Sequence, residues 1–480
     1  MSFLTELTTE AGSAARSLAH YLRGGALRLG VTGLSRSGKT VFVTSLIQNL
    51  LAGARLPVLA ASAEGRIARA YLDPQPDDAV PRFPYEEHVA ALSGPDRAWP
   101  QSTRRISQLR LSLDFERAAG WTKGPSTLHL DIVDYPGEWL LDLPLLDKSY
   151  AQWSRETLEA SATPARAPLA KAWRDCLGAH DPLTRADEET ARTLASLFTA
   201  YLRRARDDVY ALSTLPPGRF LMPGDLEDSP ALTFAPLPLA EGADVPSGSL
   251  AAMMERRYEA YKTHVVRPFF RNHFARLDRQ IVLVDALTAL NSGPAALRDL
   301  ENALGEVLNA FRAGRSSTLS KVFRPRIDRI LFAATKADHL HHRSHDRLEA
   351  ILRALVNRRI SRAESLGAKI DVIALAAVRA TREAEIRHNN ELLEAIIGVP
   401  ERGETLDGQT FDGAVEAAVF PGQLPEDPAR LFEGDSIALP ETENDLRFLR
   451  FRPPIAPRGQ PAPQIRLDRA LQFLIGDRLA

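Results

Sequence analysis

Apolar residues along the chain follow two spacings, and the two alternate. Short apolar runs predict strands at 26–32, 106–115, 126–133, 281–287, 327–334 and 370–375. The run at 281–287 is rich in β-branched residues, which is typical of a strand covered on both faces. Apolar residues at helical spacing predict helices at 40–51, 297–311 and 348–361. This alternation predicts an α/β fold, a doubly wound sheet whose strand-end loops emerge on one edge.

The pattern is different between Gly137 and Gln280, where helical spacing dominates. Segments 188–212 and 250–277 have this spacing, and a Pro/Gly-rich connector separates them. We therefore expect an all-α insertion domain that interrupts the sheet. The last segment alternates basic and aromatic residues, a composition that also suits a nucleic-acid platform. Because acidic residues are interspersed, we favour an amphipathic helix whose rings face a core and whose arginines face water.

The two ends of the chain and one early connection show weaker patterns. Residues 2–23 have apolar spacing near 3.6, which predicts an amphipathic helix, and its polar face favours packing on protein over lipid. The polar stretch 63–99 predicts a mobile connection rich in Pro and Asp. From Glu401 we expect loops, with a short strand near 448–451, until a helix at 467–479 docks back on the domain.

Composition narrows the class of protein. At 480 residues the chain is too long for one compact core, so several domains or a large insertion are expected. Lys and Arg number 60 and Asp and Glu 61, so the net charge of -1 recruits neither nucleic acid nor anionic lipid. The single cysteine, Cys176, excludes an internal disulfide framework. Without an apolar run of roughly 18 to 20 residues or a signal segment, the sequence predicts a cytoplasmic protein with no transmembrane segment.

The segment Gly33 to Thr40 (GLSRSGKT) matches the phosphate-binding pattern G-x-x-x-x-G-K-[ST]. Its glycines let backbone N–H groups surround an anion, Lys39 reaches the β- and γ-phosphates, and the Thr40 hydroxyl ligates Mg²⁺. The strand before it and the helix after it place a helix N-terminus at the phosphates. The residues expected to contact phosphate are Ser35, Arg36, Ser37, Gly38, Lys39, Thr40 and Val41.

A second motif, Asp134-Tyr135-Pro136-Gly137, follows the strand at 126–133. An acid at the carboxyl end of a buried strand is suited to serve Mg²⁺ in an α/β nucleotide site. The N–H of Gly137 can approach a γ-phosphate without interference from a side chain. An ordinary turn after a strand also contains Asp and Gly, but behind a phosphate-binding loop we favour the functional interpretation.

Taken in order, these motifs resemble a Ras-like GTPase domain. The resemblance assigns Thr103 as the switch threonine, Thr335 to Asp338 as the [NT]-K-x-D motif, and Ala377-Val378 as the short base loop. Asp338 would accept both the N1–H and the N2 amino hydrogen of guanine, a donor pair that adenine lacks. Lys336 would lie along the base plane. Threonine stands at 335 where asparagine is commoner.

More narrowly, the whole chain resembles the bacterial YcjX family, described as GTP-binding stress proteins. The likeness rests on the segments at 33–40, 134–139, 287–291, 335–338, 378–381 and 465–474. It implies a Ras-like sheet split by a helical insertion, Mg²⁺ and GTP or GDP as ligands, and a stress-related role. It also implies a membrane-protein neighbour as a partner, and peripheral membrane association through that partner.

The residue after Gly137 bears on hydrolysis. Many small GTPases have glutamine there, whereas this chain has Glu138, whose charge repels the γ-phosphate. We therefore expect slow intrinsic turnover unless a partner or an internal arginine helps, and Arg36 and Arg104 are the internal candidates. The expected catalytic residues are Lys39, Thr103, Gly137, Glu138 and Arg36, and the expected Mg²⁺ residues are Thr40, Thr103 and Asp134.

Two other functions stay open, an ATP-using phosphotransferase or ATPase and a nucleotide-stabilised scaffold without useful turnover. The histidines at 339, 341, 342 and 345 also suggest a metal site, but a solvated loop is favoured because no carboxylate or cysteine pattern completes it. The expected organisation is an N-terminal helix (1–24), a first half of the G domain (25–137), the insertion (138–279), a second half (280–385) and a C-terminal extension (386–480).

Overall fold

The computed structural model describes residues 26–34, 37–94, 96–101, 103, 105–118, 123–207, 210–227, 229–239, 244–313, 327–360, 368–388, 391–406, 408–425, 427, 446 and 448–480. The predicted N-terminal helix lies outside these residues, as do Ser35, Arg36 and Arg104.

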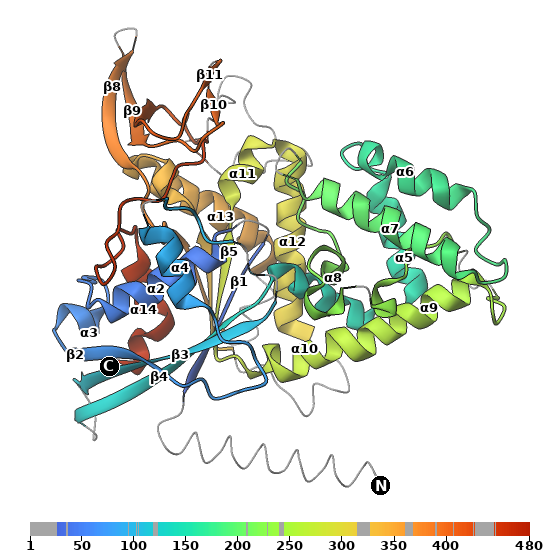
Figure 1. Cartoon of the computed structure of the whole chain (residues 1–480), viewed down its shortest axis with the longest axis horizontal. Helices are drawn as coiled ribbons and strands as arrows, with labels where there is room; N and C mark the ends of the chain where they lie inside the picture. Colours follow the sequence, from blue (N-terminus) through green and yellow to red (C-terminus); the bar gives the residue numbers. More distant parts are fainter. Residues whose placement is uncertain are drawn as a thin grey trace.

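A seven-stranded sheet forms the centre of the fold (Figure 1). Its spatial order is β2 (Ile67–Asp73), β3 (Ser107–Arg117), β4 (Gly124–Asp134), β1 (Leu27–Gly33), β5 (Arg279–Val284), β6 (Arg329–Ala334) and β7 (Lys369–Ala374). The five strands from β4 to β7 are parallel, whereas β3 is antiparallel to both of its neighbours. The α/β class predicted from the sequence is confirmed.

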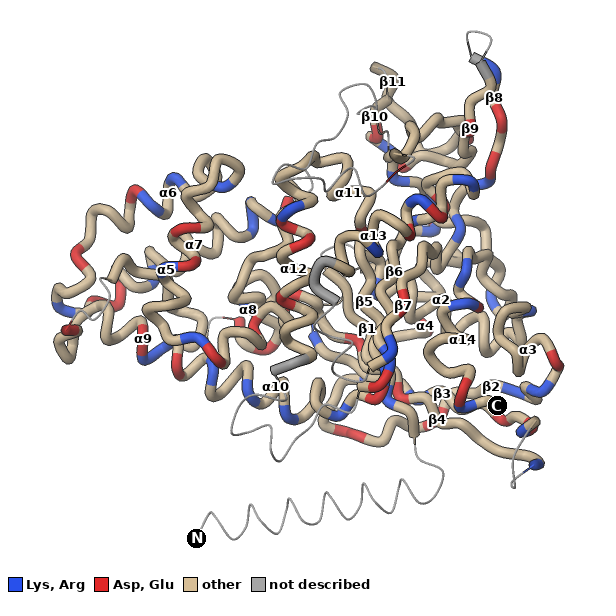
Figure 2. Tube along the Cα trace, turned by 180° about the vertical axis from the view of Figure 1, so that it is seen from behind, with Lys and Arg blue, Asp and Glu red and all other residues tan. Residues whose placement is uncertain are grey.

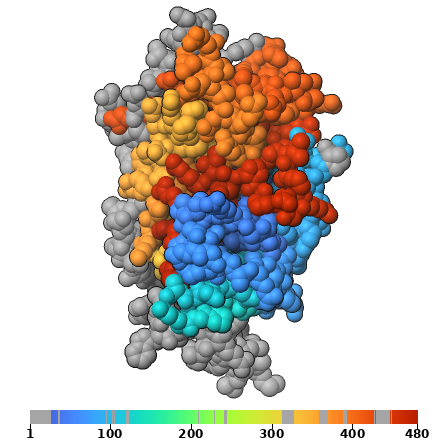
Figure 3. Space-filling model, turned by 90° about the vertical axis from the view of Figure 1, so that its left-hand side faces the viewer, coloured from blue at the N-terminus to red at the C-terminus, as the bar shows by residue number. Residues whose placement is uncertain are grey.

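Helices cover both faces of this sheet. On one face, α2 (Lys39–Leu51) packs against β1, β2 and β4, and α14 (Leu467–Ile475) packs against β6. On the other, α12 (Pro294–Ala313) and α13 (His345–Ile360) bury theirs against β5 and β6. Shorter helices are α3 (Ala60–Ala63), α4 (Tyr85–Ser93) and α11 (Ala286–Asn291). Figure 3 shows the C-terminal segment, in red, between the first part of the chain and the orange segments that follow β6.

Helices joined by loops also form the described part of the chain between β4 and β5, where one isolated bridge pairs Arg185 with Ser249. Besides short 3₁₀ turns at Gly224–Leu226, Pro230–Leu232 and Phe274–Arg276, the helices are a 3₁₀ segment (Gly137–Asp147), α5 (Tyr150–Ser161), α6 (Ala167–Gly178), α7 (Glu188–Ala205), α8 (Gly218–Leu221), α9 (Leu250–Tyr261), a π turn (Lys262–Val266) and α10 (Arg267–Asn272). Their apolar side chains join the core on the α12 side of the sheet, so one hydrophobic cluster continues from the sheet into the insertion. Among the described residues, no helix is long and apolar enough to cross a bilayer.

The aromatic side chains of the segment 250–277 are buried, with Tyr258, Tyr261 and Phe274 each fully covered. Tyr258 stacks on Trp153 of α5 at a centroid distance of 5.1 Å. Along α9, basic and acidic residues alternate rather than forming a basic stripe (Figure 2). The core interpretation of these rings is therefore confirmed over the nucleic-acid platform.

Two sequence predictions are corrected. The stretch 63–99, expected as an irregular connection, contributes edge strand β2 and helix α4. The strand escaped prediction because an edge strand is held by backbone pairing with β3 and leaves most of its side chains partly exposed.

Loops were expected from Glu401 onward, but β10 (Thr405–Leu406), β11 (Gln409–Thr410) and β12 (Ala417–Val419) lie in that region, and β8 (Arg382–His388) and β9 (Glu391–Gly398) just before it were not predicted. Strands β12, β9 and β8, in this order, form a three-stranded antiparallel sheet, and β10 pairs with β11 in a hairpin. The strand expected near 448–451 is only an isolated bridge of Phe451 with Pro400.

Candidate functional site

The carboxyl ends of β1, β6 and β7 open onto one cavity of about 250 Å³. Parallel strands point the same way, so the loops that follow them meet at one edge of the sheet. Eleven of the residues predicted from the sequence line this cavity: Ser37, Gly38, Lys39, Thr40, Val41, Thr103, Thr335, Lys336, Asp338, Ala377 and Val378. The fold therefore brings the phosphate-binding loop and the base motif together.

The phosphate-binding loop turns into α2 through Gly38. This residue has φ 78° and ψ 26°, a left-handed conformation that costs glycine little. Lys39 is the first residue of α2, and its Nζ donates to the Gly33 carbonyl oxygen at 2.9 Å. The N-terminus of α2 therefore borders the cavity, where its unpaired N–H groups and dipole favour an anion.

Three oxygen-bearing side chains converge beside this loop. Thr40 Oγ1 lies 3.1 Å from Thr103 Oγ1, and Thr103 Oγ1 donates to Asp134 Oδ2 at 2.5 Å. Burial raises the pKa of Asp134 to about 6, although the Thr103 bond and the charge of Lys39 act in the opposite direction. Its other oxygen, Oδ1, is buried and accepts no hydrogen bond within the described chain. Hydroxyl and carboxylate oxygens are the donors that Mg²⁺ prefers, so this set fits that ion.

Asp338 is 5% exposed and is held in place by the loop after β7. The N–H of Ala380 donates to Asp338 Oδ2 at 2.9 Å, and the Thr381 hydroxyl donates to the Asp338 carbonyl oxygen. The β6 and β7 loops are therefore joined at the residue proposed to recognise the base.

Lys336 is positioned by a residue that the sequence analysis did not single out. Its backbone is left-handed, with φ 61°, and its Nζ donates to Asp285 Oδ2 at 2.5 Å. Burial favours protonation of Asp285, but the charge and hydrogen bond of Lys336 outweigh it and lower the pKa. Asp285 also caps α11 through the Thr288 N–H. An acid at the end of a buried strand, the same signal that identified Asp134, was available to find it.

The C-terminal extension supplies a wall that no sequence pattern indicated. Glu401, Arg450 and Phe451 line the cavity together with Trp99. Trp99 Nε1 donates to the Phe451 carbonyl oxygen at 2.7 Å, and the ring of His339 meets the Phe451 ring edge to face at 5.5 Å. Trp99 and Phe451 are 352 positions apart in the chain, so only the fold brings them together.

Gly137 and Glu138 lie beside the cavity and not in its lining. A Cβ on Gly137 would be 2.1 Å from the Gly33 carbonyl oxygen, so the two glycines pack backbone against backbone. Glu138 is 4% exposed, and its Oε1 lies 3.0 Å from Arg206 Nη2, directly after α7. Gly218 of α8 packs against the Glu138 carbonyl group. The carboxylate expected near the γ-phosphate therefore faces the insertion.

The sheet order, the loop between β1 and α2 and the motifs at the sheet edge define a Ras-like P-loop fold. The model of the YcjX-like family, DUF463, matches residues 27–479, so the chain belongs to this family. A protein of Escherichia coli (strain K12) named Ras-like GTPase YcjX is 41% identical over 465 residues, covering 94% of this chain and 96% of the relative. A protein of the same name from Shewanella oneidensis is 35% identical over 488 residues, covering 97% of each.

Proposed function

We propose that this chain is a GTP-binding protein that slowly hydrolyses GTP to GDP and phosphate with Mg²⁺ and acts as a nucleotide-dependent switch. The observation that carries the proposal is the single cavity that joins Lys39 and Thr40 to Asp338. The relatives' name, Ras-like GTPase, supports it. A stress-related role and a membrane-protein partner are implied by the family resemblance.

In the proposed complex, Lys39 and the N-terminus of α2 bind the β- and γ-phosphates. Thr40, Thr103 and Asp134 would hold Mg²⁺, which when bound neutralises charge on those phosphates. The Gly137 N–H approaches the γ-phosphate, and Trp99 with Phe451 restricts water at the cavity. Asp338 accepts the guanine N–H pair while the Lys336 stem covers the base.

Slow turnover follows from the position of Glu138. Its carboxylate is paired with Arg206 and is turned away from the cavity, so it is poorly placed to orient the attacking water. Mg²⁺, Lys39 and the N–H groups of the loop still stabilise charge on the transferring phosphoryl group. We therefore expect phosphate release without a partner to be slow.

The switch hypothesis rests on contacts that lead from the expected γ-phosphate position to the insertion. Thr103 reaches Asp134 directly, and Gly137 packs on Gly33 of the phosphate-binding loop. The next residue, Glu138, contacts Arg206 and Gly218 of the insertion. A displacement of Gly137 on loss of the γ-phosphate would therefore be passed to the insertion by direct contact.

The test is a titration of the purified full-length protein with fluorescent GDP, GTP and ATP in Mg²⁺, followed by phosphate release on the same sample. We expect preference for guanine with slow release. Equal or tighter ATP binding would favour the phosphotransferase or ATPase, and binding without any release would favour the scaffold.

Three substitutions test which residues bind the nucleotide. Lys39→Ala is expected to abolish nucleotide binding, and Asp134→Ala to weaken the Mg²⁺-dependent part of it while the fold stays intact. Asp338→Asn is expected to shift preference from guanine to xanthine nucleotides, because the amide offers a donor where the carboxylate offered an acceptor. Asp175→Asn, on an exposed acid of α6, is the matched control. Unchanged GTP affinity in Asp338→Asn would contradict the assigned base contact.

A further inference from the structure

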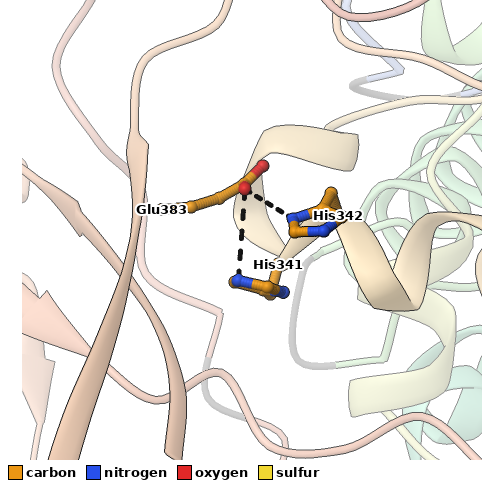
Figure 4. Close-up of side chains that lie close together, drawn as sticks. All are labelled: His341, His342 and Glu383. Atoms are coloured by element: carbon orange, nitrogen blue, oxygen red, sulfur yellow. Dashed lines mark hydrogen bonds and ion pairs between the residues drawn. The ribbon is translucent and has the colours of Figure 1, made fainter.

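The histidine cluster after Asp338 is not the solvated loop expected from the sequence. His341 and His345 are 5% and 4% exposed, because the loop packs under the C-terminal sheet. A carboxylate also completes the group, since Glu383 of β8 lies beside His341 and His342 (Figure 4). The sequence did not reveal this carboxylate because it is 41 positions away from His342.

His341 faces two carboxylates across gaps that are too wide for hydrogen bonds. Its Nε2 lies 4.0 Å from Glu383 Oε2, and its Nδ1 lies 3.8 Å from Glu394 Oε2. Nδ1 is buried and has no hydrogen-bond partner in the described part of the chain. Nδ1 faces Glu394, whereas Nε2 faces Glu383 Oε2, and the 4.0 Å gap on the Nε2 side is wide enough for a small cation to lie between the two atoms.

The side chains at this position indicate that the cation is a metal ion. His341, His342 and Glu383 each offer one ligand atom, and these three atoms lie within 4.8 Å of one another. Imidazole nitrogen and carboxylate oxygen bind Zn²⁺ at about 2.0 to 2.2 Å, so neighbouring ligand atoms in a tetrahedral site are about 3.3 Å apart. The two nitrogen–oxygen distances in this group lie on either side of that value. His342 Nδ1 is 2.6 Å from Glu383 Oε2, and His341 Nε2 is 4.0 Å from the same oxygen. His342 Nδ1 is hydrogen-bonded to Glu383 Oε2, and because His342 is 60% exposed, its ring has room to exchange this bond for one to a metal ion.

Charge around the cluster leaves Glu383 available. Arg343 pairs with Glu394 at 2.9 Å and approaches Glu385 at 3.7 Å, so these two acids already have a cation. Arg379 reaches only the other oxygen of Glu383, Oε1, at 3.4 Å. The Oε2 atom therefore faces the two imidazoles.

We propose that His341, His342 and Glu383 form a Zn²⁺ site with one coordination position left for water. The site does not depend on the proposed nucleotide function. It would connect the loop after Asp338 with strand β8, which begins directly after Thr381. Zn²⁺ would thus fasten the C-terminal sheet to the loops at the base end of the cavity.

The test uses the full chain after treatment with a chelator, titrated with ZnCl₂ alone by calorimetry. We expect one equivalent to bind and to raise the melting temperature. His342→Ala and Glu383→Gln are expected to weaken Zn²⁺ binding about tenfold or more, since each removes a ligand. Both changes are at positions where the fold is expected to survive, and circular dichroism without metal checks this.

His264→Ala, which removes an exposed histidine from the π turn, is the matched control and is expected to keep the parent affinity. Co²⁺ in place of Zn²⁺ is expected to give the visible absorption of a four-coordinate site in the parent and not in Glu383→Gln. Absence of Zn²⁺ binding, or equal affinity in the parent and both ligand variants, would overturn the proposal. A melting temperature that responds to pH but not to Zn²⁺ would show an ordinary histidine–glutamate ion pair.

Discussion

Arg206 Nη2 lies 3.0 Å from Glu138 Oε1, an ion pair that joins the end of α7 to the residue directly after the Asp134–Gly137 motif. Neither oxygen of Glu138 accepts a well-aligned hydrogen bond within the described residues, so charge proximity is the main attraction. The sequence predicted a carboxylate that repels the γ-phosphate. The structure instead neutralises it with an arginine of the insertion.

Removing that arginine is expected to leave a buried charge without its partner. Arg206→Ala should lower the free energy of unfolding by about 3 kcal/mol. The double variant Arg206→Ala/Glu138→Gln should recover part of this loss, because the neutral amide needs no counter-charge. Urea denaturation at pH 7 measures both. Arg203→Ala, on an exposed arginine in the last turn of α7, is the control, and an Arg206 effect no larger than that of Arg203→Ala would contradict the prediction.

The contact of Gly218 with Glu138 is expected to tolerate no side chain. A Cβ on Gly218 would be 2.0 Å from the Glu138 carbonyl oxygen and 2.4 Å from its carbon, both backbone atoms that cannot move aside. Gly218→Ala should therefore destabilise the protein by about 3 kcal/mol or more. Gly178→Ala, in open space at the end of α6, should instead stabilise it by about 0.5 kcal/mol. Thermal unfolding compares the two, and similar melting temperatures would refute the packing argument.

Asp142 makes stability depend on pH. It is 2% exposed, accepts bonds from the Gly218 N–H and the Tyr261 hydroxyl, and burial raises its pKa from 3.8 to about 6. The folded state thus keeps this proton to higher pH than the unfolded state. Binding of this proton contributes about 3 kcal/mol to the free energy of unfolding. The contribution is complete below about pH 4 and is lost as the pH rises through about 6.

Asp142→Asn removes that titration. The difference in unfolding free energy between parent and variant should change by about 1 kcal/mol between pH 5 and pH 7, with the parent losing stability relative to the variant as pH rises. Both proteins contain the other titratable groups, including Asp134, so the contributions of those groups to the pH dependence cancel in the difference. A difference that stays constant with pH would show that Asp142 titrates equally in the folded and unfolded states.

Trp99 should report occupancy of the cavity. It lines the cavity and donates to the Phe451 carbonyl oxygen, so a bound nucleotide would change its surroundings. Titration with GDP is expected to change tryptophan fluorescence in the parent and in Trp173→Phe, whose indole is buried in the insertion. Trp99→Phe should lose most of the change while keeping GDP affinity within about tenfold. If Trp99→Phe kept the full fluorescence change on GDP binding, another tryptophan would be the one that responds to the nucleotide.

Much of the fold was predictable because its signals are local. The alternation of apolar runs and helical spacing specifies parallel strands with covering helices, and a phosphate-binding loop constrains its own backbone through Gly38. Strands β2, β8 and β9 were missed because backbone pairing holds them and their side chains show no long apolar run.

The sequence by itself determined that Lys39, Asp134 and Asp338 follow strands of one parallel sheet, and therefore that they share an edge. Only the tertiary structure decided which distant residues complete that edge. Phe451 beside Trp99, Arg206 on Glu138 and Glu383 beside His341 each pair residues that are far apart in the chain. Such contacts arise from how the insertion and the C-terminal extension pack on the sheet, and no spacing within either segment encodes its partner.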